Sequence, residues 1–132
     1  MTITSVLVGA ALSALIVLTL RAAPRRAVAQ TGYLAFVIML SIYFGAHLVS
    51  SADPRIAAEA VFVAAAIAFA RIGMKRDPRL IGALTLAHPL YDLLFGPQTG
   101  VADWYPGLCL GFDVVLGFGL VWLLRPAKRE AA

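Results

Sequence analysis

The stretch Leu80–Phe95 reads LIGALTLAHPLYDLLF and places two ionisable side chains, His88 and Asp92, four residues apart in an otherwise apolar run. Apolar runs approaching 20 residues are typical of membrane-spanning helices. Histidine and aspartate are costly inside a bilayer and usually mark a functional site there. The stretch therefore predicts a membrane helix that carries part of a polar site.

The whole chain has the composition of an integral membrane protein. Its 132 residues are 61% hydrophobic and only 14% charged. The mean hydropathy of +0.88 lies outside the range of ordinary soluble domains. We therefore predict an all-α, multi-pass protein of the cell membrane, with residues 1–132 forming a single transmembrane domain.

Five apolar runs predict five spanning helices, at about residues 3–20, 31–51, 55–72, 80–95 and 105–124. A turn at 50–54 and a longer loop at 96–104 join them on one side, and the tail at 127–132 is expected to be disordered. The first run is not expected to be a signal peptide, because arginines follow it and no basic residue precedes it.

Basic residues divide unequally between the two sides of this arrangement. One side carries ten Lys and Arg residues and the other carries Arg55 alone, which predicts an extracytoplasmic N-terminus and a cytoplasmic C-terminus. The ten are Arg21, Arg25, Arg26, Arg71, Lys75, Arg76, Arg79, Arg125, Lys128 and Arg129. Because they lie in short loops, the net charge of +4 indicates contact with anionic membrane lipid, and no nucleic-acid partner is expected.

Five ionisable side chains lie within the predicted spans, all in the outer half of the membrane. Counted at about 1.5 Å per residue, two of them, His47 and Glu59, have matching depths on consecutive helices. Each would be costly facing lipid alone, so they should converge on a pocket open to the outer face or outer leaflet. The expected catalytic residues are His88, Asp113, Asp92, His47 and Glu59.

Structural explanations exist for most of these residues. Glu59 could pair with Arg55 one turn away, and Asp92 is close enough to the helix end to be solvated. The histidines could be neutral and hydrogen-bonded to backbone or to each other. Asp113 is the hardest to explain in this way, because it is deep and has no nearby Lys or Arg in the sequence. Pro89 predicts a kink or break at His88, which would suit a helix that lines a cavity.

Aromatic and small residues complete the predicted site and its packing. The side chains expected to contact a substrate are Tyr43, Tyr91, Trp104, Tyr105 and Cys109, although such aromatics often serve as interface or packing residues. Gly107–Gly111 and the alanine-rich third run predict close helix packing, within the chain or in a homo-oligomer.

Acid–base chemistry on a lipophilic small molecule is the first function that these residues support. A desolvated carboxyl can act as an acid and a neighbouring histidine as a base. Isomerisation, epoxide opening or hydrolysis, and cyclisation are reactions of this kind. Five spans around such groups resemble the membrane sterol isomerases and the integral-membrane terpene cyclases, a resemblance of architecture that implies an isomerase, cyclase or hydrolase but transfers no catalytic residue.

Three other functions stay open. The five ionisable residues include ligands that suit Zn, Fe or Mn, so a metal ion is the one cofactor considered; the sequence contains no phosphate-binding glycine loop, nucleophile elbow or CxxC motif. Intramembrane acids and histidines also suit a proton- or metal-ion-coupled carrier, although the inner half of the helices is mostly apolar. The fourth is a non-catalytic assembly subunit.

Overall fold

A computed structural model of the chain describes residues 2–50, 54–95 and 100–126. Within these ranges it forms five helices and no strand: α1 (Ile3–Leu20), α2 (Arg25–Ser50), α3 (Arg55–Arg76), α4 (Arg79–Phe95) and α5 (Tyr105–Leu123). The predicted all-α class is confirmed. Most of the predicted turn at 50–54, the loop segment 96–99 and the tail 127–132 lie outside the described residues.

Four of the helices, α1, α2, α3 and α5, are long and apolar enough to cross a membrane. The fourth predicted span corresponds to α4, which has 17 residues. Two helices are longer than their apolar runs, because α2 begins at Arg25 and α3 continues to Arg76. Hydropathy detects only the apolar part of a helix, whereas long basic side chains let the helix continue while their charges reach water.

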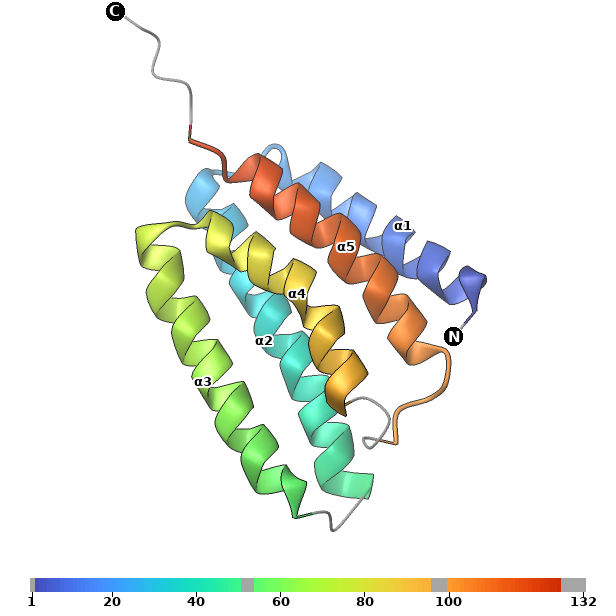
Figure 1. Ribbon diagram of the computed structural model, residues 1–132. Coiled ribbons are helices and arrows are strands. Elements are labelled where there is room, and N and C mark those ends of the chain that lie inside the picture. The colour runs from blue at the N-terminus through green and yellow to red at the C-terminus, as the bar shows by residue number, and fades with distance from the viewer. Residues whose placement is uncertain (1, 51–53, 96–99, 127–132) are drawn as a thin grey trace, which may run out of the picture.

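The helices pack so that α5 lies between α1 and α4, with α2 and α3 on the other side of α4 (Figure 1). The first and last helices are therefore neighbours, and α3 lies at the edge of the bundle. The buried core runs between α2, α4 and α5 and includes Phe36, Leu40, Ile81, Leu116 and Leu120.

Glycines set the two closest helix contacts. A Cβ atom on Gly9 would lie 2.0 Å from the carbonyl oxygen of Leu108, and one on Gly111 would lie 2.0 Å from that of Val6, so α1 and α5 touch through their backbones. The predicted close-packing role of Gly111 is confirmed. Between α4 and α5, a Cβ on Gly82 would lie 2.8 Å from the Gly117 carbonyl oxygen.

The alanines of α3 behave differently from these glycines. Ala70 is buried, but most of the others, such as Ala57, Ala64 and Ala68, are exposed at the edge of the bundle. The alanine-rich face is thus largely unused in packing among the described residues. A homo-oligomer through this face remains a prediction.

Pro89 does not break its helix. α4 continues from Arg79 to Phe95 with Pro89 inside it, so a break at His88 is not observed, and a kink there stays a prediction. Proline removes one backbone donor, but a helix packed on its neighbours tolerates this loss.

The connection between α3 and α4 is held by one ion pair. The Asp77 carboxylate accepts a hydrogen bond from the Arg79 backbone N–H at 3.0 Å and another from the Arg79 Nη2 at 2.7 Å. These hydrogen bonds lower the pKa of Asp77 below its usual value. The carboxylate is therefore favoured in the folded state.

We expect Asp77→Ala to lower the melting temperature at pH 7. Because the folded-state pKa is lowered, the stabilisation is fully present above the ordinary value of 3.8 and is lost as the pH falls through the lowered pKa. Melting temperatures of the two proteins in detergent, measured from pH 7 to pH 3, should converge at the acidic end. A constant difference across that range would contradict the role of the charge.

Gly9→Ala should destabilise the protein by roughly 1–3 kcal/mol, because the new methyl group would force the α1 and α5 backbones apart. Gly45→Ala is the matched control, since a Cβ there meets nothing within 4 Å. That variant should be neutral, or more stable by up to about 1 kcal/mol through helix propensity. Equal stabilities of the two variants in chemical denaturation would rule out the backbone contact.

Candidate functional site

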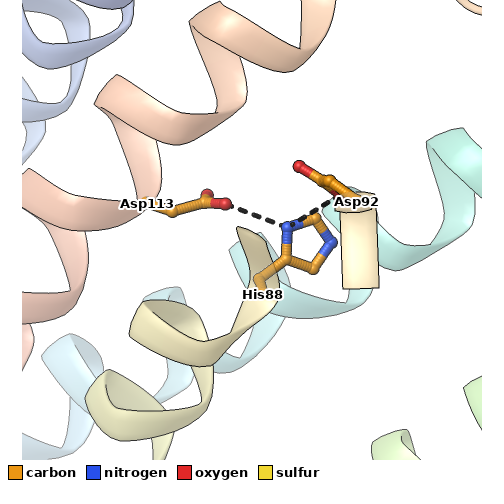
Figure 2. Close-up of side chains that lie close together, drawn as sticks. All are labelled: His88, Asp92 and Asp113. Atoms are coloured by element: carbon orange, nitrogen blue, oxygen red, sulfur yellow. Dashed lines mark hydrogen bonds and ion pairs between the residues drawn. The ribbon is translucent and has the colours of Figure 1, made fainter. Parts of the chain in front are cut away.

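His88 lies at the centre of a buried polar group formed by α4 and α5 (Figure 2). Its Nδ1 atom is 2.9 Å from Asp113 Oδ2 and 3.5 Å from Asp92 Oδ1. His88 is 2% exposed, Asp92 8% and Asp113 0%. The three residues that the sequence placed on two separate helices thus form one cluster, which we call the His88 cluster.

Local structure explains why these side chains meet. His88 and Asp92 are four residues apart on α4 and share a face. Asp113 lies one turn from Gly117, whose contact with Gly82 brings the α4 and α5 backbones together. Without a side chain at either glycine, α5 approaches closely enough for the Asp113 carboxylate to reach the imidazole.

The hydrogen bonding of the His88 cluster is incomplete. Nδ1 can carry one proton, and the shorter distance assigns its hydrogen bond to Asp113. Among the described residues, both Asp92 oxygens, Asp113 Oδ1 and His88 Nε2 are buried without a hydrogen-bond partner. Two carboxylates carry more negative charge than one imidazole can match, and unpaired buried charge is costly. The cluster therefore requires an additional proton or a cation.

Glu59 forms a second buried group with residues of α2 and α4. Its Oε2 atom pairs with His47 Nδ1, and its Oε1 atom accepts a hydrogen bond from the Tyr91 hydroxyl. His47 and Glu59 are both 0% exposed. This contact agrees with the matching depths of His47 and Glu59, and the alternative pairing of Glu59 with Arg55 is not observed. The convergence expected of all five ionisable residues is seen as two neighbouring groups among the described residues.

Tyr43 connects the two groups. Its ring centroid lies 6.1 Å from that of His88 and 6.0 Å from that of Tyr91, and the Tyr91 ring lies 5.5 Å from His88. The Tyr43 hydroxyl is buried beside Asp92 and Cys109 but makes no hydrogen bond of normal geometry with the described residues. The predicted inward direction of this hydroxyl agrees with the structure.

The other predicted contact residues divide into two sets. Tyr105 lies 5.6 Å from Tyr43 between ring centroids, and Cys109 is buried, so both face the interior with Asp113. Trp104 is 53% exposed and precedes α5. It packs beside Tyr105 and is not part of the buried site.

Sequence reasoning missed two aromatic residues. Phe36 makes an edge contact with His88, with 6.4 Å between centroids, and Phe62 stacks on Tyr91 at 5.6 Å. Phe36 precedes Tyr43 by seven residues, which is two helical turns on the same face. That spacing was the signal available in the sequence.

The five ionisable groups are closely packed in the part of the chain that the structure describes, and the expected pocket open to the outer face stays a prediction. The five ionisable side chains are at most 8% exposed and pack against one another and against aromatic rings. A cavity lined by basic residues lies at the other end of the bundle, where α2 begins and α3 ends. Asp92 is the most exposed acidic member of the site.

Comparison of the chain with protein-family models, curated proteins and solved structures gave no match. Function must therefore be inferred from the chemistry of the site.

Tyr91→Phe should lower the free energy of unfolding by about 1–3 kcal/mol, because it leaves one buried Glu59 oxygen without its donor. Tyr33→Phe is the control: Tyr33 is partly exposed, and its ring contact with Arg71 does not need the hydroxyl. The control should change stability by less than about 0.5 kcal/mol. If both variants unfold at the same denaturant concentration, the Tyr91 hydrogen bond does not stabilise the fold.

Proposed function

We propose that all five helices span the membrane, with the N-terminus outside and the C-terminus in the cytoplasm. The distribution of Lys and Arg supports this topology. At about 1.5 Å per residue, the 17 residues of α4 extend about 26 Å, close to the ~30 Å hydrocarbon thickness. The polar groups then belong to the outer half of the bilayer.

We propose that the protein is a membrane enzyme that transfers protons on a lipophilic small molecule. The observation that carries this proposal is the buried His88–Asp113 hydrogen bond with the Asp92 carboxylate 3.5 Å from the same nitrogen and without a hydrogen bond of its own among the described residues. A carboxylate that accepts a hydrogen bond from Nδ1–H fixes the imidazole tautomer and leaves Nε2 as a base. This is the arrangement by which acids orient catalytic histidines.

In this function each member of the His88 cluster has its own role. His88 accepts or delivers the proton through Nε2, and Asp113 orients it. Asp92 holds the additional proton that the cluster requires and supplies it as an acid. An acid and a base in one water-poor site are what isomerisation, epoxide opening and cyclisation need.

The aromatic residues suit a lipophilic substrate that reacts through a cation. The rings of Phe36 and Tyr43 make T-shaped contacts with the imidazole, and the Tyr91 and Tyr105 rings lie beside them. Aromatic faces stabilise positive charge. These features support the functional resemblance to membrane sterol isomerases and terpene cyclases, which rests on architecture and chemistry alone.

Substrate would enter from the outer leaflet beside Asp92. Leu90, Leu93 and Leu94 lie exposed on the same turns of α4, where they would face lipid. The stacked Phe62 and Tyr91 rings close this side. Separation of α3 from α4 at these rings would open the site.

Proton transfer can be tested before the natural substrate is known. The full-length protein in liposomes made with D₂O is incubated with a panel of isoprenoid alkenes, sterols and epoxides, and deuterium uptake or product formation is followed by mass spectrometry. His88→Ala and Asp113→Asn should reduce the rate by about 10²–10⁴-fold, the usual contribution of a positioned acid or base. Both variants should remain folded.

Asp103→Asn is the matched control, since Asp103 is exposed in the segment before α5 and should leave the rate unchanged. If the wild-type protein converts a substrate and both His88→Ala and Asp113→Asn keep full turnover, the assignment is wrong. A wild-type protein inactive on every member of the panel would contradict these substrate classes.

A metal-dependent function is the second candidate, and one observation favours it. Ligand atoms of His88, Asp92 and Asp113 all lie within 4.8 Å of one another. One imidazole nitrogen and two carboxylate oxygens suit Zn, Fe or Mn, and a cation would match the excess negative charge. His47 and Glu59, which the sequence also offered as ligands, belong to the other polar group.

Elemental analysis decides between the two functions. A metal site requires about one equivalent of Zn, Fe or Mn per chain in protein purified without chelators, and loss of that metal in His88→Ala and Asp92→Asn. Glu59→Gln, outside the ligand group, should keep it. A wild-type protein that stays metal-free after incubation with each ion would exclude the metal function.

A further inference from the structure

A cavity of about 420 Å³ lies at the end of the bundle remote from the His88 cluster. It is formed where α2 begins, α3 ends and the connection to α4 starts, and these segments lie together in Figure 1. Lys75 follows Glu59 by 16 residues, which is about 24 Å along α3. The cavity is therefore separate from the proposed catalytic site.

Four cationic side chains line this cavity, together with the amide of Gln30. They are Arg25, Arg26, Arg71 and Lys75. None of the described lining residues is acidic. Ala29 and Met74 are buried and form an apolar floor. Positive charge is thus concentrated around a concave surface rather than spread over a convex one.

Two of the arginines are held in place by neighbouring groups. Arg25 donates a hydrogen bond from Nη2 to the Leu124 carbonyl oxygen at 2.6 Å. The Arg71 guanidinium carbon lies 5.6 Å from the centre of the Tyr33 ring. Restricting these side chains reduces the conformational entropy lost on binding.

The nearest acid does not cancel this charge. Asp77 lies close enough to interact electrostatically with Arg25, but both of its oxygens accept hydrogen bonds from the Arg79 guanidinium. Arg79 is not one of the lining residues. The Asp77–Arg79 pair is neutral overall, so the four lining cations keep their net charge.

We propose that this cavity binds a phosphate-bearing anion at the membrane surface, either an anionic lipid headgroup or phosphate free in solution. Guanidinium groups hold phosphate oxygens with paired hydrogen bonds, and lysine adds a mobile charge. Basic cavities between membrane helices on the cytoplasmic side are suited to anionic lipid headgroups. The ten basic residues of this end place it on that side in the proposed topology.

The test measures binding of two stated probes to the full-length protein at constant ionic strength. One probe is dioleoyl phosphatidylglycerol, with dioleoyl phosphatidylcholine for comparison, detected by native mass spectrometry and by the shift in melting temperature. The other is inorganic phosphate, with chloride for comparison. Tighter binding of phosphatidylglycerol than of phosphatidylcholine, without binding of inorganic phosphate, identifies a lipid site. Binding of inorganic phosphate as tight as that of phosphatidylglycerol, and tighter than that of chloride, identifies a site for free phosphate.

Variants distinguish the cavity from general surface charge. Arg71→Gln and Lys75→Gln should each weaken binding about tenfold, the loss expected for one charge-assisted hydrogen bond. Arg76→Gln removes an equal charge from the same end of α3 but from outside the lining, and should weaken binding less than twofold. Arg71→Lys should bind more tightly than Arg71→Gln. That recovery would show that Arg71→Gln changes the site and leaves the fold intact.

Two results would overturn the proposal. One is binding that falls equally in Arg71→Gln, Lys75→Gln and Arg76→Gln, because it would reflect screened surface attraction alone. The other is absence of binding of both probes to the wild-type protein. Neither result bears on the chemistry of His88, because none of these residues lies in the His88 cluster or contacts it.

Discussion

Burial of charge in apolar surroundings is the constraint that organises this structure. Glu59, Asp92 and Asp113 lie on three helices whose other side chains are mostly apolar, and each is at most 8% exposed. The free-energy cost of burying a carboxylate without a partner is larger than the stabilisation that a single helix–helix contact provides. The helices must therefore be placed so that these acids meet His47, His88 and Tyr91, and that requirement fixes the rotation of α2, α3, α4 and α5 about their axes.

Glycine makes this requirement attainable. Apolar helices in lipid gain little from the hydrophobic effect and associate through close contact. Gly82 contacts Gly117, which brings the backbones of α4 and α5 together. Gly9 on α1 and Gly111 on α5 each contact the backbone of the other helix, which brings α1 and α5 together. α3 lacks such glycine contacts with its neighbours in the middle of the bundle and is joined to them by Glu59 instead. Glycines thus bring α1, α4 and α5 into contact, and the polar contacts of Glu59 attach α3 to the bundle.

The sequence predicted the helices better than the arrangement of side chains in the site. Apolar runs locate the middle of each helix. The start of α2 and the end of α3 carry basic residues, so a search for apolar residues places these helix ends too early or too late. Counting residues along consecutive helices placed His47 level with Glu59, and the structure shows them in contact. Such counting could not show that Asp113 takes the Nδ1 hydrogen bond of His88, because that depends on which helices are neighbours. The aromatic neighbours of His88 and Tyr91, which are Phe36, Phe62 and Tyr43, were not predicted as a group, because side-chain packing cannot be read from spacing.

The two polar groups depend on different supports, and this has a consequence for how the site would open. The His88 cluster joins α4 to α5, whose backbones are already in contact through glycine, so its geometry is fixed by rigid packing. The Glu59 group joins α3 at the edge of the bundle, where stacked Phe62 and Tyr91 rings and two hydrogen bonds hold it. A movement of α3 would expose the His88 cluster to a lipophilic molecule without disturbing the His88–Asp113 distance. In the proposed function, His88 on the rigid contact would carry the chemistry, and movement of α3 beside it would admit a substrate dissolved in the membrane.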